Sequence, residues 1–207
     1  MSKMAPPVNA LFSRCASEEK LKSSGTARFL TRCSQMRAVR YYALMPKDAS
    51  DAERLTAFHE AGHAVMAQLC GRQVTEVEIV GDREHTGMVH SLAFPPDPED
   101  GAAPEAENDD VERQLKIILA GTVAEAVVSG RQGWDETSED LDAAVRLGMR
   151  LVDDCEDVLP LLKDIGADVE RELGRHWAAV EMLAVELLDS KTLTGSEVRK
   201  LLTPLLN

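Results

Sequence analysis

One stretch of the chain, residues 52–69, combines a helical pattern with a pair of histidines and so restricts how the chain can fold. Its apolar residues recur every three or four positions from residue 55 to residue 69, which predicts one buried face of an α-helix. Ser50 or Asp51 is suited to cap the start of this helix, and Gly71 is suited to end it. We therefore expect a helix that packs into the centre of a domain.

This predicted helix carries the sequence His59-Glu60-Ala61-Gly62-His63. Residues four apart share one face of a helix, so both imidazoles can bind the same metal ion. Glu60 points about 100° further round the helix axis, where it can take a proton from a water molecule without becoming a ligand. Zinc held by three protein ligands keeps a position for water and lowers the pKa of that water to about 7. We therefore predict a hydrolytic Zn²⁺ site with His59 and His63 as metal ligands and Glu60 as the catalytic residue.

A third protein ligand is required, and the residues alone leave several candidates. A metzincin would have Gly and His three and six positions after the second histidine; this chain has Met and Leu there, which excludes that class. Glu84 is near the spacing of a gluzincin ligand but falls in a predicted hairpin turn. The acidic residues of 136–142 remain, and His85 and His90 beside the hairpin are weaker candidates.

The remaining pattern predicts a mainly α fold with a small β-hairpin. Aromatic residues make up only 4% of the chain, so the core must consist largely of Ala, Val and Leu. Alternating residues predict strands over 74–80 and 87–94, and the acidic stretch 95–110 is interpreted as a loop. Thr137 is the expected cap of the third helix, with Asp140 in the first turn as in a capping box. Further helices are expected at 111–129, 138–152, 167–188 and 195–202.

The charge of −13 is distributed unevenly along the chain. Residues 1–50 have a net charge of +6, whereas residues 51–207 have a net charge of −19. An acidic domain excludes nucleic acid as a partner, because phosphates repel it. No apolar run reaches the roughly 18 residues that a membrane span requires. We expect a basic, disordered leader over 1–50 and a cytoplasmic domain over 51–207; if the leader is a transit peptide, the location is an organelle.

Five segments between about residue 57 and residue 202 form a recognisable series: residues 58–64 (FHEAGHA), 74–80 with 87–88, 119–125 (LAGTVAE), 137–141 (TSEDL) and 183–195. In this order they resemble the peptidase domain of the FtsH family of AAA+ zinc metalloproteases. The chain departs from the family pattern at Thr122, where the family has Arg, and at Glu139, where it has Asn. Neither change affects the predicted metal chemistry.

This resemblance implies an FtsH-type protease fold and a zinc metalloendopeptidase that cleaves unfolded proteins or peptides. It also implies that Asp140 is the third zinc ligand, that Glu125 is a partner of a ligand imidazole, and that the chain forms a homo-oligomer such as the family's hexamers. The family is ATP-dependent, but these 207 residues contain no G-x-x-x-x-G-K-[ST] phosphate loop. We therefore expect a separate ATPase or unfoldase as a partner. The alternative is a non-catalytic scaffold or assembly partner with the same fold.

Overall fold

The computed structural model confirms a mainly α fold with a small antiparallel sheet. It describes residues 49–79, 88–91, 104–130 and 138–206. The predicted basic leader and the turn of the hairpin lie outside these residues, apart from the last two residues of the leader. None of the helices among the described residues is long and apolar enough to cross a lipid bilayer. The elements are α3 (Asp51–Leu69), β1 (Val74–Glu78), β2 (Met88–Ser91), α4 (Pro104–Ser129), α5 (Glu139–Gly148), a 3-10 turn η2 (Cys155–Asp157), α6 (Val158–Arg175), α7 (Trp177–Ser190), β3 (Thr192–Thr194) and α8 (Gly195–Leu206).

Helix α3 begins and ends where the sequence predicts. The Ser50 hydroxyl accepts a hydrogen bond from the backbone N–H of Glu53, whose carboxylate accepts one from the backbone N–H of Ser50. This capping box satisfies two N–H groups that a helix start leaves unpaired. Beyond Leu69 the chain turns through Gly71, whose φ of 73° is a conformation that glycine adopts without strain.

The sheet has three strands in the order β2-β1-β3, one more than the predicted hairpin. The first predicted strand is shorter than expected, since β1 ends at Glu78. Of the second predicted strand the structure describes residues 88–91, which form β2, and the remaining residues of that prediction lie outside the described residues. In the added strand, Leu193 lies opposite Val77 on β1, and both side chains are buried. A strand of three residues is too short to show an alternating pattern, which is why the sequence did not reveal β3.

The predicted acidic loop over 95–110 is wrong over its last seven residues, because α4 begins at Pro104. Proline is favoured in the first turn of a helix, because a backbone N–H there would have no hydrogen-bond partner within the helix. This turn lacks an apolar face, so hydrophobic periodicity could not detect it. The helix ends before Gly130, as predicted.

The expected boundaries of the later helices also change. Helix α5 covers Glu139–Gly148 rather than 138–152; Ser138 occupies the cap position without a side-chain capping bond, and Thr137 lies outside the described residues. The helix predicted over 167–188 is instead two helices, α6 and α7, separated at His176. The backbone of His176 leaves the helical region, with φ −108° and ψ 22°. Trp177 follows this break and begins α7, which packs on α3.

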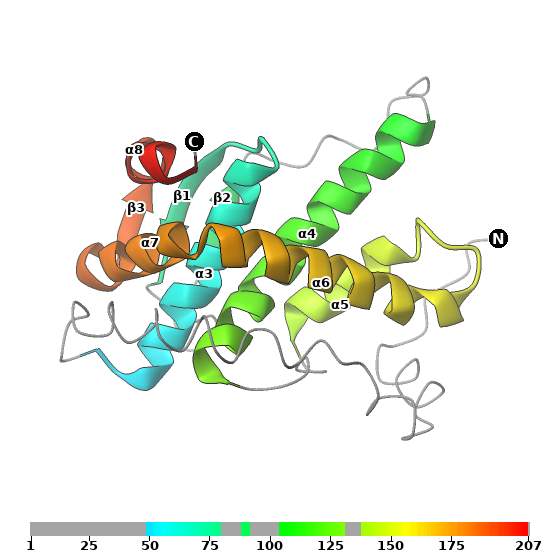
Figure 1. Ribbon diagram of the computed structural model, residues 1–207, viewed down its shortest axis with the longest axis horizontal. Coiled ribbons are helices and arrows are strands. Elements are labelled where there is room, and N and C mark those ends of the chain that lie inside the picture. Colours follow the sequence, from blue (N-terminus) through cyan, green and yellow to red (C-terminus); the bar gives the residue numbers. More distant parts are fainter. Residues whose placement is uncertain (1–48, 80–87, 92–103, 131–137, 207) are drawn as a thin grey trace.

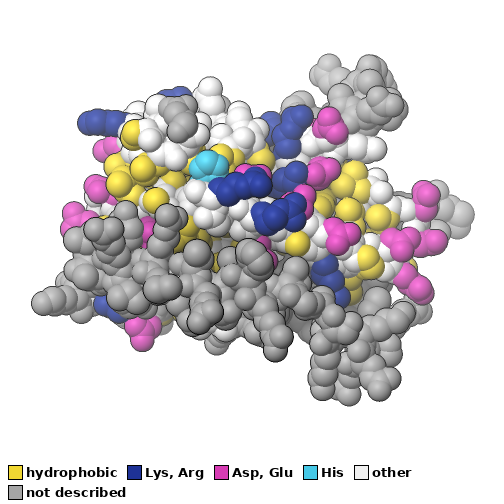
Figure 2. All heavy atoms as spheres, in the orientation of Figure 1, with side chains coloured by type: hydrophobic (Ala, Val, Ile, Leu, Met, Phe, Trp, Pro, Cys, Tyr) yellow, Lys and Arg dark blue, Asp and Glu magenta, His cyan; other side chains and the backbone are white. Residues whose placement is uncertain are grey.

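Helix α3 lies at the centre of the domain, between α4 and α7 (Figure 1). Helices α6 and α7 follow one another across the front of α3 and α4, α5 packs on α4, and the sheet and α8 lie at the other end. Figure 2 shows acidic and basic side chains interspersed over this front face. Helix α6 carries the exposed ion pairs Arg171–Asp168 and Arg175–Glu172. The core beneath consists mostly of Ala, Val and Leu, as the composition predicted.

Candidate metal centre

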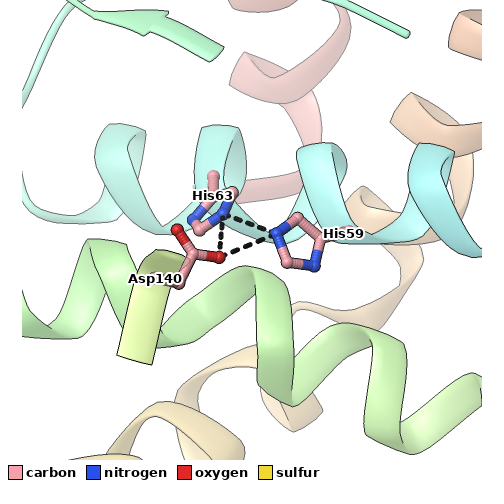
Figure 3. Close-up of side chains that lie close together, drawn as sticks. All are labelled: His59, His63 and Asp140. Atoms are coloured by element: carbon pink, nitrogen blue, oxygen red, sulfur yellow. Dashed lines mark hydrogen bonds and ion pairs between the residues drawn. The ribbon is translucent and has the colours of Figure 1, made fainter. Parts of the chain in front are cut away.

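Three side chains from two helices meet at one point, as Figure 3 shows. His59 and His63 come from successive turns of α3, and Asp140 comes from the first turn of α5. Nε2 of His59 lies 3.0 Å from Nε2 of His63. Oδ2 of Asp140 lies 2.9 Å from Nε2 of His59 and 3.3 Å from Nε2 of His63. Among the described residues this is the group of His, Cys, Asp and Glu side chains arranged to hold a metal ion.

The other ring nitrogen of each histidine faces a residue of α4. Nδ1 of His63 lies 2.7 Å from the backbone oxygen of Ile117, so its N–H donates to that carbonyl. Nδ1 of His59 lies 3.5 Å from Oε2 of Glu125. Such partners fix the tautomer of an imidazole and leave Nε2 free to bind a metal. Glu125 is the residue that the family resemblance implied as a partner of a ligand imidazole, and it stays a prediction in that role. A backbone carbonyl such as that of Ile117 has no sequence signal.

The size of this triangle suits a zinc ion. Four ligands at about 2.0–2.1 Å in a tetrahedron stand roughly 3.3 Å from one another. The three donor–donor distances of 2.9, 3.0 and 3.3 Å are close to this value. Two imidazole nitrogens and a carboxylate oxygen are also a donor set that zinc accepts, with one position left for water. The residues present therefore fit the ion that the motif predicts.

The charges of the site favour an ionised carboxylate. Burial alone would raise the pKa of Asp140, but the hydrogen bonds from His59 and His63 outweigh it and hold the pKa well below its usual range. Burial lowers the pKa of His59, but the contacts with Asp140 and Glu125 dominate and raise that pKa to about 10. The site therefore prefers a positive charge beside the carboxylates, which a metal cation would supply in place of the proton.

Glu60 is buried on α3 beside this group, with 6% of its surface exposed. Burial raises the pKa of its carboxyl, while the neighbouring charges of His63 and His59 act in the opposite direction. A carboxyl whose pKa moves upward towards neutrality is a better acceptor and donor of protons at physiological pH. Its position one residue after His59 keeps it close to the donor triangle but outside the set of converging atoms.

Small residues bring α3 and α4 close enough for these contacts. A Cβ added to Gly62 would stand 2.5 Å from the backbone oxygen of Ala120 and 2.7 Å from Cβ of Ala124. Only a glycine at this position lets the two helices approach so closely. The close approach places Ile117 and Glu125 at the two histidine rings. The sequence showed Gly62 only as one apolar-face position of the motif, because its neighbours on α4 are more than 50 residues away in the chain.

Comparison with known proteins gives a family match and several distant relatives. The model of Peptidase family M41 matches residues 48–155. The chain is 25% identical over 183 residues to a protein of Arabidopsis thaliana described as ATP-dependent zinc metalloprotease FTSH 11, chloroplastic/mitochondrial. It is 22% identical over 195 residues to the ATP-dependent zinc metalloprotease FtsH of Rickettsia bellii. Each alignment covers 75% of this chain, but only 22% and 30% of those two relatives. The chain thus spans less than a third of the length of these curated relatives.

Proposed function

Because the chain belongs to peptidase family M41, we propose that it is a zinc-dependent metalloendopeptidase with His59, His63 and Asp140 as the metal ligands. The observation that carries this proposal is the convergence of the three donor atoms from α3 and α5. A chance contact between helices would not also give both histidines an acceptor on their second nitrogen. Family membership therefore supports the metalloprotease class, and the geometry supports these three residues as its ligands.

In this proposal Glu60 is the general base. Bound zinc would polarise the scissile carbonyl and lower the pKa of the attacking water to about 7. Glu60 takes the proton of that water and then returns it to the leaving amine. Burial, which raises the pKa of Glu60, suits a group that must both accept and donate a proton in one cycle. Glu125 and the Ile117 carbonyl hold the imidazoles in place.

We further propose unfolded proteins or peptides as substrates, with unfolding carried out by an ATPase outside these 207 residues. The names of the relatives describe them as ATP-dependent, which supports this division of labour. Peptide cleavage by the purified 207-residue chain should then be unaffected by ATP alone. Homo-oligomerisation and a cytoplasmic location stay predictions. The names of the plant relatives specify chloroplast or mitochondrion, which favours the organellar alternative for residues 1–50.

The test is cleavage of casein by the purified chain and its Glu60→Gln variant. The amide keeps the shape of the carboxylate but cannot accept a proton, so the rate should fall about 10²–10⁴-fold while zinc content stays at the parental level. Chelation should abolish cleavage by the parent. Glu112→Gln is a matched control, because Glu112 is a half-exposed glutamate on α4 that pairs with Lys116.

Two results would count against the proposal. Parental cleavage by Glu60→Gln contradicts the general-base role. If neither protein cleaves casein or peptides although zinc is fully bound, the chain is a scaffold with an intact metal site, which is the alternative function.

A further inference from the structure

Gly121 on α4 faces the donor atoms of the metal centre. A Cβ added to Gly121 would stand 2.7 Å from Nε2 of His59, and nearer still to Nε2 of His63. These are the two nitrogens that converge with Oδ2 of Asp140. The missing Cβ of Gly121 thus corresponds to space at the meeting point of the donors.

We propose that Gly121 is a positioning residue for the metal ion, because its lack of a side chain keeps the space between the two imidazoles open. This inference rests on the proposed zinc site. A methyl carbon keeps about 3.5 Å or more from atoms to which it is not bonded. Alanine at this position would therefore force both rings to swing away from α4.

Such a movement should lower the affinity for the metal ion without disrupting the fold. The atoms in contact are the far ends of two side chains, which can rotate without shifting a helix. Rotation, however, separates the two Nε2 atoms from each other and from Asp140. It also weakens the contacts of His63 with Ile117 and of His59 with Glu125, which depend on the present ring positions.

Two other glycines show what makes Gly121 distinct. The Cβ of an alanine at Gly62 would meet the backbone of α4, which cannot rotate away, so Gly62→Ala should lower the free energy of unfolding. Gly174 on α6 has no atom within 4 Å of an added Cβ, so alanine is accommodated there. Gly121 alone of these three should affect zinc while leaving the fold in place.

The experiment measures zinc affinity by competition with a chelating dye for the parent, Gly121→Ala and Gly174→Ala chains. Thermal unfolding of each is followed by circular dichroism in the presence of chelator. We expect Gly121→Ala to bind zinc at least about tenfold more weakly than the parent, in the range found when partners of metal ligands are lost. Its helical content should equal that of the parent, and Gly174→Ala should bind zinc with parental affinity.

Equal zinc affinity in Gly121→Ala and the parent overturns the inference and leaves the proposed zinc site standing. A parent chain that binds no zinc overturns both. If Gly121→Ala does not fold in chelator, the inference attributes this to a clash between the added methyl group and the two imidazoles. Adding His59→Ala and His63→Ala removes both rings and should therefore restore folding. A triple variant that stays unfolded would also overturn the inference.

Discussion

Helix α3 packs against α7 through large aromatic side chains and against α4 through small residues and polar groups. Towards α7, Phe58 and Trp177 stack with their ring centroids 5.9 Å apart and an angle of 8° between the planes. Towards α4, small residues such as Gly62 bring the backbones together, and the polar groups of the metal centre occupy the same interface. The first side buries bulky apolar area, which stabilises the fold. The second holds polar atoms at set distances, so we infer that it serves chemistry and contributes less to stability.

Trp177→Ala should have the largest effect on stability. Removing a buried tryptophan costs about 3–5 kcal/mol of unfolding free energy through lost contacts and the cavity left behind. The Nε1–H of Trp177 also donates to the buried carboxylate of Glu181 at 2.9 Å, and that bond is lost as well. Urea unfolding with chelator present measures the change.

If the two sides of α3 are separable, the folded fraction of Trp177→Ala binds zinc with the parental affinity. Trp177→Phe is the matched control, because it keeps an aromatic ring against Phe58 while it removes the hydrogen bond to Glu181, at about 1–3 kcal/mol, and part of the buried indole volume. A large loss of zinc affinity in either variant would show that the aromatic side also sets the metal geometry.

Glu125→Ala tests the opposite side of the helix and should have a smaller effect. Losing the carboxylate that faces Nδ1 of His59 should weaken zinc binding about 10–100-fold, which is the usual effect of removing a partner of a metal-binding histidine. Stability in chelator should change little, since Glu125 is partly exposed. As a control, Glu112→Ala at a half-exposed position on the same helix should leave zinc affinity unchanged. An equal loss in both variants would mean that net charge is responsible.

The sequence could predict the local features of α3 but not the distant residue that completes the metal centre. The cap at Ser50, the i, i+4 histidines and the end of the helix near Gly71 are local patterns, and the structure has each of them. The prediction that Asp140 is the third ligand rested on a family resemblance, because nothing in the spacing of residues 63 and 140 shows that α5 begins beside α3. Its position next to both histidines depends on the tertiary structure.

Other features escaped prediction because they depend on contacts between distant segments. The strand β3 gains its hydrogen bonds from β1, more than a hundred residues earlier in the chain. The break at His176 divides a sequence that is helical on both sides, and Trp177, the next residue, stacks on Phe58 of α3. The α4 contacts of the imidazoles, from Ile117 and Gly121, involve a backbone carbonyl and an absent side chain, which carry no pattern of their own.

Ser50→Ala should act on both sides of α3 equally, with a modest effect. It removes the hydroxyl that accepts from the backbone N–H of Glu53, and the loss of such a cap costs about 0.5–2 kcal/mol. Chemical unfolding measures this difference. Zinc affinity should be unchanged, because the cap lies more than two turns from His59. A selective loss of zinc binding would contradict the view that the first turn only anchors the helix.

The smallest expected effect is a pH dependence at the same cap. Hydrogen bonds from the backbone and hydroxyl of Ser50, followed by Lys191, lower the pKa of Glu53 to about 2 from a usual value of 4.5. A lowered carboxyl pKa adds stability that is complete above pH 4.5 and is lost as the pH falls towards 2. Thermal unfolding of the parent and Glu53→Gln should therefore differ most above pH 4.5 and converge as the pH falls towards 2. A difference that grows in acid would have the wrong sign.

Zinc K-edge X-ray absorption on the purified, zinc-loaded chain tests the central claim most directly, because it reports the ligand atoms themselves. The account predicts a four-coordinate site with nitrogen and oxygen ligands at about 2.0–2.2 Å, the scattering pattern of two imidazoles, and no sulfur. Asp140→Ala should lose bound zinc or replace one protein oxygen by water. A sulfur ligand at about 2.3 Å, or an imidazole signal that persists unchanged when His59 and His63 are both replaced by alanine, would contradict the claim that α3 and α5 together form the metal site.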